Sequence, residues 1–188
     1  VDFLGEYTAG LYGHSHPVLM AALRRALDDG VVLGGHNEAE ARLAQAVVDR
    51  FPSIERVRFT NSGTEANLMA ISTARAFTKR PKVMAMQGGY HGGVFYFVKP
   101  ELPINAPFPF VFGRTNETDY TRELIRKHGS ELACVIVEPM MGGTGCLPAG
   151  HEFLEMLREK TQACGAVLIF DEVMTSRLGP NGLQGRLG

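Results

Sequence analysis

The stretch Asn61-Ser62-Gly63-Thr64-Glu65-Ala66-Asn67 decides the fold of this chain. It follows an extended apolar run at residues 57–60 and opens a segment with helical spacing. Small and hydroxyl-bearing residues between a strand and a helix suit a phosphate site. Gly63 lets the backbone come close, Ser62 and Thr64 offer hydroxyl groups, and the first N–H groups of the helix are free to face an anion. An ordinary Ser/Thr helix cap is the alternative interpretation, so the rest of the chain has to decide.

Helical and extended segments alternate along the chain. Apolar residues at helical spacing predict helices at residues 17–29, 38–51, 63–78, 118–127 and 152–164. Apolar runs that end in glycine or polar residues predict strands at residues 56–60, 82–86, 133–137 and 166–170. The last two strands are continuously apolar, as is typical of strands buried on both faces of a parallel sheet. We therefore predict an α/β fold, a mostly parallel sheet with helices on both faces.

The segments outside this alternation are less regular. Residues 1–13 read as extended, with a polar turn at His14 and His16 that could also supply metal ligands. Val18, Leu23 and Leu27 give the helix after that turn an apolar face. Residues 100–116 form an irregular, proline-rich passage. Thr118 or Asp119 is expected to cap the helix that follows it.

Polar side chains follow several of the predicted strands. In open α/β sheets the ligand sits at the carboxyl ends of the strands. Asp171 comes directly after strand 166–170, and if buried it needs a cation or a strong donor. A protonated pyridine nitrogen is one fitting cation, and a carboxylate there makes the ring a better electron sink. A metal-binding aspartate or a polar strand terminus is the alternative.

Tyr90, His91 and Glu138 occupy two further strand ends. The ring of Tyr90, between glycines, could lie against a flat cofactor, or it could cover the edge of the sheet. His91 could pack behind that site or form a hydrogen bond in the core. Other motifs are absent: the sequence has no phosphate-binding P-loop, no dinucleotide fingerprint, no nucleophile elbow and no Cys/His metal spacing.

The composition excludes some partners. The chain has 188 residues, 45% of them hydrophobic, and a net charge of -1. This charge gives no electrostatic reason to expect nucleic acid, and no apolar run reaches the length of a membrane span. Three cysteines without C-x-x-C spacing predict reduced, mostly buried thiols and a cytoplasmic location. Because the chain starts inside an expected strand and stops after a loop, we expect a piece of a longer protein.

The motifs in their order resemble a known family. Asn61-Ser62-Gly63-Thr64-Glu65-Ala66, Gly89-Tyr90-His91-Gly92, Val137-Glu138-Pro139 and Asp171-Glu172-Val173-Met174-Thr175 look like the signature blocks of class III (subgroup II) aminotransferases. These are fold-type I enzymes that use pyridoxal phosphate. Within the family, residues 51–59 are similar to the glutamate-1-semialdehyde aminomutase-like branch. Residues 6–10, 34–37 and 174–178 are similar to β-amino-acid (β-phenylalanine type) aminotransferases.

The resemblance implies a role for each matching residue. Ser62, Gly63 and Thr64 are expected to hold the phosphate, Tyr90 and Val173 to cover the two faces of the pyridine ring, and Asp171 to pair with the ring nitrogen. Glu138 is expected near the ring hydroxyl, and His91 joins the cofactor-binding set through its motif. The resemblance also implies a homodimer, with an amino acid and a 2-oxo acid as substrates.

One family residue is missing. The lysine that forms the Schiff base with the cofactor lies beyond the Asp171 block in the family, after a segment that follows Gly188. We therefore expect residues 1–30 to lead into the large domain and residues 31–188 to be part of that domain, truncated before the lysine. These residues alone are expected to be inactive. An aminomutase of the same family and a non-catalytic domain that binds a phosphorylated ligand are the alternatives.

Overall fold

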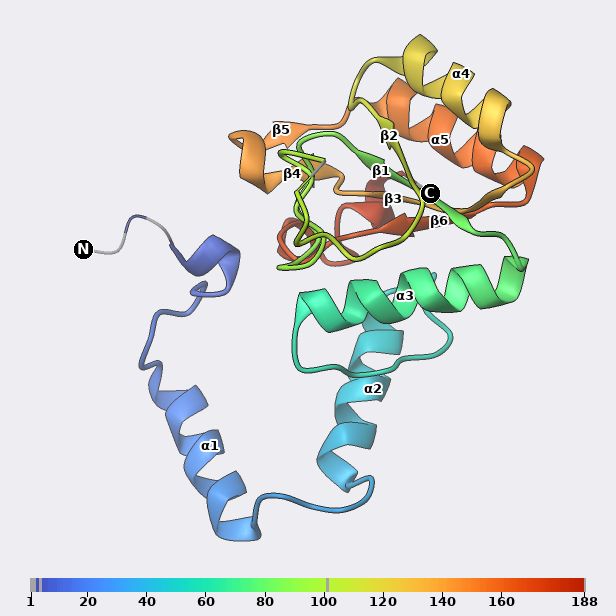
Figure 1. The fold of residues 1–188 in the computed structure, drawn as a ribbon. Helices are drawn as coiled ribbons and strands as arrows, with labels where there is room; N and C mark the ends of the chain where they lie inside the picture. The colour runs from blue at the N-terminus through green and yellow to red at the C-terminus, as the bar shows by residue number, and fades with distance from the viewer. Residues whose placement is uncertain (1–2, 4, 101, 188) are drawn as a thin grey trace.

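The computed structural model describes residues 3, 5–100 and 102–187, and its centre is a four-stranded parallel sheet (Figure 1). The strands are β1 (Lys82–Met86), β2 (Phe110–Gly113), β3 (Leu132–Val137) and β6 (Val167–Phe170), in the order β2-β1-β3-β6. A separate antiparallel pair, β4 (Met140–Met141) and β5 (Leu147–Pro148), follows β3. Every pairing in the main sheet is parallel, so this part of the fold prediction is confirmed.

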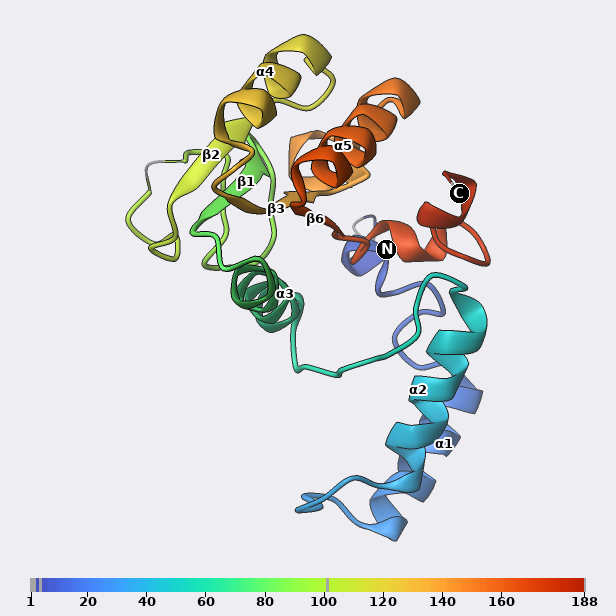
Figure 2. The ribbon, with the colours of Figure 1, turned by 90° about the vertical axis from the view of Figure 1, so that its right-hand side faces the viewer.

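Helices cover both faces of the sheet (Figure 2). On one face lies α3 (Gly63–Thr78), and on the other α4 (Thr118–His128) packs beside α5 (His151–Cys164). Both β2–α4–β3 and β3–α5–β6 step in the same direction across the sheet, which places their helices on one face. The predicted arrangement of helices on both faces is therefore confirmed.

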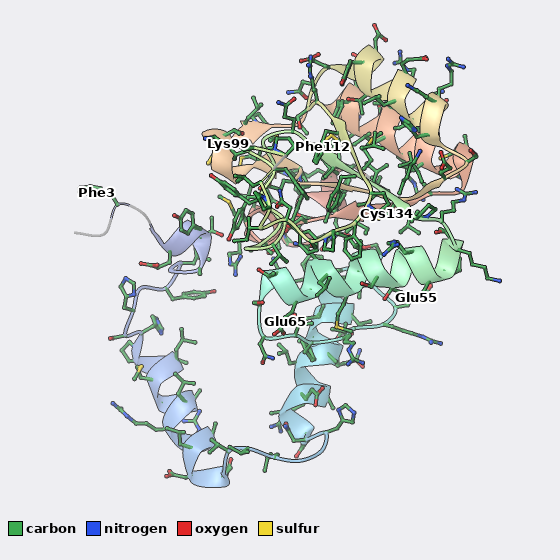
Figure 3. The ribbon with its side chains drawn as sticks, viewed as in Figure 1. Phe3, Glu55, Glu65, Lys99, Phe112 and Cys134 are labelled. Carbon is green, nitrogen blue, oxygen red and sulfur yellow. The ribbon has the colours of Figure 1, made fainter. Side chains whose placement is uncertain are left out.

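Two hydrophobic layers follow from alternation along the strands. In β1, Met84 and Met86 pack toward α4 and α5, whereas Val83 and Ala85 pack toward α3. Strand β3 is buried along its whole length. Beside α3 the layer is aromatic, and Figure 3 shows the side chains that fill it, with Phe112 and Cys134 labelled. The strand ends are thus held by packing on both sides.

Helix α1 (Pro17–Asp29), in the N-terminal part of the chain, stands away from the sheet. The short 3-10 helix η1 (Gly5–Thr8) precedes it, and α2 (Glu38–Arg50) follows it. Neither α1 nor α2 has a buried residue, and Figure 1 shows α1 clear of the sheet. The apolar faces predicted for these helices are present, but Val18, Leu23 and Leu27 are exposed.

The segment after β6 is held by two charged side chains. It contains the 3-10 helices η3 (Thr175–Arg177) and η4 (Gln184–Arg186). The 3-10 helix η2 (Gly142–Thr144) lies elsewhere, between β4 and β5. The backbone N–H groups of Leu183 and Gln184 donate to the carboxylate of Glu172, at 2.7 and 3.0 Å. Arg50 donates to the carbonyl of Pro180 at 2.8 Å, which ties α2 to the same segment.

Several local predictions are wrong. Residues 56–60 are extended but form no strand, because no described strand lies beside them to pair with. Residues 5–8 are a 3-10 turn rather than extended chain; the strand expected at residues 1–4 lies, apart from Phe3, outside the described residues. The irregular passage contains β2, which pairs with β1. Helix α4 begins after Glu117, and no side chain caps it.

Other expectations fall on single residues. His14 and Ser15 form the expected turn. Of the three free cysteines, Cys134 is buried and Cys164 half-buried, but Cys146 is exposed, so the prediction of mostly buried thiols is only partly right. No helix among the described residues is long and apolar enough to cross a membrane. Within the same residues, no group of three or more His, Cys, Asp or Glu side chains is placed to hold a metal ion.

Candidate active site

A cavity of about 620 Å³ lies at the carboxyl ends of the strands. The strand order reverses at β1, with β2 on one side and β3 and β6 on the other, and ligands of open α/β sheets bind at such a point. Seven of the eight predicted site residues line the cavity: Gly63, Thr64, Tyr90, His91, Glu138, Asp171 and Val173. Ser62 lies just outside. Segments far apart in the sequence therefore meet at one place.

Asp171 is buried at the end of β6 with donors on both oxygens. Its Oδ2 accepts from Asn67 Nδ2 at 2.7 Å and lies 2.9 Å from His91 Nδ1; its Oδ1 accepts from the backbone N–H of Val173 at 3.1 Å. Burial by itself would raise the pKa of Asp171, but the hydrogen bond and charge of His91, with the other two donors, outweigh it and lower the pKa. The carboxylate is therefore ionised at neutral pH.

His91 and Asn67 hold that carboxylate from behind. His91 is buried, and its contact with an ionised Asp171 places a proton on Nδ1. Its Nε2 has no hydrogen-bond partner among the described residues. Asn67 also donates to the His91 carbonyl at 3.0 Å, so one amide fixes both residues. His91 lines the cavity and forms a buried hydrogen bond, so the structure agrees with both of the roles considered for it.

Asn67 is a buried polar residue of the site that the sequence motifs do not predict. It lies four residues after Gly63 and four before Ile71, on the face of α3 that packs against the sheet. A buried amide on the apolar face of a helix needs a polar partner, and this spacing was a signal that sequence reasoning could have used.

Glu138 closes the cavity beneath the loop after β1. Its Oε1 accepts from the backbone N–H of Tyr90 at 2.8 Å, and its Oε2 accepts from the N–H of Gly142 at 3.0 Å. Burial raises the pKa of Glu138, although the two backbone donors counteract this effect and the charge of Asp171 adds to it. The residue thus fixes two loops and is more easily protonated than an ordinary glutamate.

Tyr90 and Val173, which are expected to cover the two faces of a flat ring, both line the cavity. Tyr90 is about half exposed, and its ring packs edge-on with the ring of Tyr96, with 5.9 Å between the two ring centroids. Val173 lies in the segment after β6. A Cβ at Gly63 would lie only 3.2 Å from Val173 Cγ2, so the absence of a side chain at Gly63 leaves room for Val173.

The first turn of α3 also lines the cavity, through Gly63 and Thr64. Ser62 caps the helix, since its Oγ accepts from the N–H of Glu65 at 3.2 Å. The helix-cap interpretation of this residue is therefore correct. Among the described residues, no hydrogen bond satisfies the N–H groups of Gly63 and Thr64, and these are the groups that face an anion at a helix start. Thr64 Oγ1 accepts from the N–H of Gly93 at 3.1 Å.

The N-terminal segment adds a wall that the sequence did not predict. Glu6, Tyr7 and Ala9 line the cavity. Thr8 Oγ1 donates to the carbonyl of Met174 at 3.2 Å, which fastens this segment to the residues after Asp171. Only the tertiary fold brings these residues together, because they are separated by most of the chain.

Comparisons with known proteins agree with this geometry. The family model described as aminotransferase class-III matches residues 1–100 and 96–182. The chain belongs to the class-III aminotransferases. The β-phenylalanine transaminase of Variovorax paradoxus is 51% identical over 187 residues, covering 100% of this chain and 43% of that protein. Its crystal structure superposes with a TM-score of 0.95, covering 100% of this chain and 44% of the other.

Two further relatives extend the comparison. A glutamate-1-semialdehyde 2,1-aminomutase from Thermodesulfovibrio yellowstonii is 38% identical over 194 residues, covering 93% of this chain and 44% of that protein. A solved transaminase with pyridoxal phosphate bound has 36% identity and a TM-score of 0.91, and the match covers 100% of this chain and 47% of that one. This class-III aminotransferase chain therefore has the predicted fold-type I architecture and spans less than half the length of these relatives.

The family's cofactor fits the residues of the cavity. An ionised Asp171 suits a protonated pyridine nitrogen, the Tyr90 ring and the Val173 side chain supply faces for a flat ring, and the free N–H groups of α3 suit a phosphate. Comparisons and structure thus agree with pyridoxal phosphate as the cofactor predicted for this class-III aminotransferase.

Proposed function

We propose that the full-length protein transfers an amino group from an amino acid to a 2-oxo acid with pyridoxal phosphate as cofactor. The observation that carries this proposal is the position of Asp171. It is a buried, ionised carboxylate in the lining of a cavity, and the first turn of α3, with its free N–H groups, lines the same cavity. A cofactor with a basic ring nitrogen at one end and a phosphate at the other complements this pair.

In this proposal each site residue has a defined task. The N–H groups and hydroxyls of Ser62, Gly63 and Thr64 hold the phosphate, while Tyr90 and Val173 confine the ring between them. Asp171 accepts a hydrogen bond from the ring nitrogen through the remaining lone pair of its Oδ1, because Asn67 and His91 share Oδ2 and the Val173 N–H uses one site of Oδ1. Asn67 and His91 keep Asp171 in place and ionised.

The bound cofactor supplies an electron sink for the charge that develops when the substrate loses a proton. The chain's contribution is to keep the ring nitrogen protonated. Asp171 does this because its hydrogen bonds from His91 and Asn67 lower its pKa and keep it ionised. Glu138 supports the ring hydroxyl side and joins the loops after β1 and β3. The flanking apolar side chains limit the access of water to the reacting face.

The substrate and assembly are part of the same proposal. We propose a β-amino acid as the donor, supported by the similarity to a β-phenylalanine transaminase. The exposed apolar face of α1 supports a homodimer, because a second copy can cover it. The three free thiols support a cytoplasmic location.

A second candidate is a 2,1-aminomutase. The 38% identity to a glutamate-1-semialdehyde 2,1-aminomutase favours it. That reaction returns the amino group to the same carbon skeleton and needs no second substrate. Turnover of the full-length holoenzyme should therefore be measured with β-phenylalanine in the presence and absence of a 2-oxo acid. Strict dependence on the acceptor supports transamination; product from glutamate-1-semialdehyde without any acceptor overturns it.

The residues described here do not include the catalytic lysine of the family. All five lysines, Lys79, Lys82, Lys99, Lys127 and Lys160, precede the Asp171 block. We propose that residues 1–188 expressed alone bind the cofactor without a covalent bond and do not turn over. Turnover by this piece above background contradicts the proposal, and loss of cofactor on gel filtration agrees with it.

A further inference from the structure

The charges around the cavity are unevenly distributed. Among its described lining residues, Glu6, Glu138 and Asp171 are acidic, and His91 is already in contact with Asp171. Arg177 is the one lysine or arginine side chain that the described part of the chain contributes to the lining. Any carboxylate that enters this cavity meets repulsion from three acids and attraction from one guanidinium.

The guanidinium of Arg177 is held in place by one of its nitrogens. Nη1 donates to the carbonyl of Val173 at 2.6 Å and to Thr8 Oγ1 at 3.4 Å. Nε and Nη2 form no hydrogen bond with the described residues, and no carboxylate among those residues lies within ion-pair distance. An oriented guanidinium with unused donors on one side fits a carboxylate through two parallel hydrogen bonds.

The position of Arg177 couples it to the reaction centre. It belongs to η3, six residues after Asp171, and its anchor is the backbone of Val173, which lines the same cavity as Tyr90. Thr8 fastens the N-terminal wall to the same turn through the carbonyl of Met174. A group bound to Arg177 is thus held in a fixed position relative to Val173 and Tyr90, the residues proposed to confine the cofactor ring.

We propose that Arg177 binds the carboxylate of the amino-acid substrate. This inference rests on the proposed function, since it names the group that orients the donor in the same cavity. Recognition requires a negative charge on the substrate, so an amine of the same shape without that charge is bound less tightly. The Arg177 contact thereby distinguishes amino acids from simple amines.

The test compares a charged and a neutral substrate on the full-length holoenzyme. Arg177→Gln should raise the KM for β-phenylalanine by about tenfold to hundredfold, because it removes a charge-assisted hydrogen-bond pair. The KM for the neutral carboxamide of β-phenylalanine should change by less than about twofold. Arg186→Gln is the matched control, because Arg186 is exposed and lies outside the cavity lining, and its side chain forms a single hydrogen bond among the described residues, to the Leu178 carbonyl.

A binding measurement separates this inference from the proposed function. Phenylpropanoate, the acid without the amino group, is titrated calorimetrically into wild-type and Arg177→Gln holoenzyme, which needs no turnover. Weaker binding in the variant, by about tenfold or more, supports the inference even if transamination itself fails. Equal binding to both, or an equal KM rise for acid and carboxamide, overturns it and leaves Arg177 as a link between Thr8 and Val173.

Discussion

Asp171 is an ionised group taken out of water, and three donors compensate for its burial. Asn67, His91 and the N–H of Val173 share the two oxygens, so each donor contributes to keeping the carboxylate charged. Because the folded state lowers the pKa of Asp171, its stabilising contribution is present above the unfolded pKa and is lost as the pH falls through the folded value. The residue that defines the site is therefore also a folding contact.

Asn67→Ala tests this network at its least obvious member. The change removes a donor from a buried carboxylate and from the His91 carbonyl, so we expect the free energy of unfolding to fall by about 1–3 kcal/mol. The pKa of Asp171 should also rise. Urea unfolding of the full-length apoprotein measures the first effect. Asn181→Ala, at an exposed position, is the control, and equal stabilities of the two variants contradict the account.

Glu138 should show the opposite pH dependence. Its pKa is raised in the folded state, so ionisation weakens the fold as the pH rises above the ordinary glutamate value of 4.5. Glu138→Gln cannot ionise. The unfolding free energy of wild type relative to this variant should therefore decrease from acid to neutral pH. Denaturation curves at a series of pH values check this, and a pH-independent difference rules out the raised pKa.

At the scale of elements, the sequence predicts most strands and the helices packed on them. It predicts the connecting segments less well. The runs at residues 82–86 and 133–137 are apolar on both faces and form strands in the sheet. The run at residues 56–60 alternates polar and apolar residues, as a half-buried strand does, but it has no partner strand, and pairing is not encoded in a single segment. Strand β2 was missed because Pro107 and Pro109 precede it, although its edge position tolerates such a start.

The site shows the same division. Side chains at strand ends, such as Tyr90 and Asp171, were predicted because the fold class places such ends together. Asn67, Arg177 and Tyr7 were missed, because their positions depend on how a helix, a turn and a distant segment pack around the cavity. No sequence spacing brings Thr8 to Met174.

The contact between the loop after β1 and the start of α3 depends on a glycine. A Cβ at Gly92 would lie 2.3 Å from Thr64 Oγ1 and 2.6 Å from Thr64 Cα, and the φ of +123° is unfavourable for other residues. We expect Gly92→Ala to lower the unfolding free energy by about 1–3 kcal/mol. It should also weaken cofactor binding, measured by titration of the full-length apoprotein with pyridoxal phosphate.

Gly93→Ala is the matched control, since a Cβ there meets nothing within 4 Å. This variant should bind the cofactor as the wild type does. If both alanine variants bind equally well, the close approach of Gly92 to Thr64 has no part in forming the phosphate end of the site.

At the scale of the whole molecule, helix α1 leaves its apolar face exposed. Helix α1 has no buried residue, and its apolar face presents Leu23, 58% exposed, and Leu27, 64% exposed. If a second copy covers this face, Leu23→Asp in the full-length protein should weaken self-association about tenfold or more, measured by sedimentation. Arg25→Asp on the opposite face is the control. Unchanged association of Leu23→Asp shows that another part of the protein covers α1.

The central claim is that Asp171 keeps the cofactor's ring nitrogen protonated, and nitrogen NMR tests it most directly. The full-length protein is loaded with pyridoxal phosphate labelled with nitrogen-15 in the ring, and wild type is compared with Asp171→Asn. The account predicts a protonated nitrogen in the wild type throughout the neutral pH range and an unprotonated one in the variant. The same ring-nitrogen shift in both proteins would contradict it.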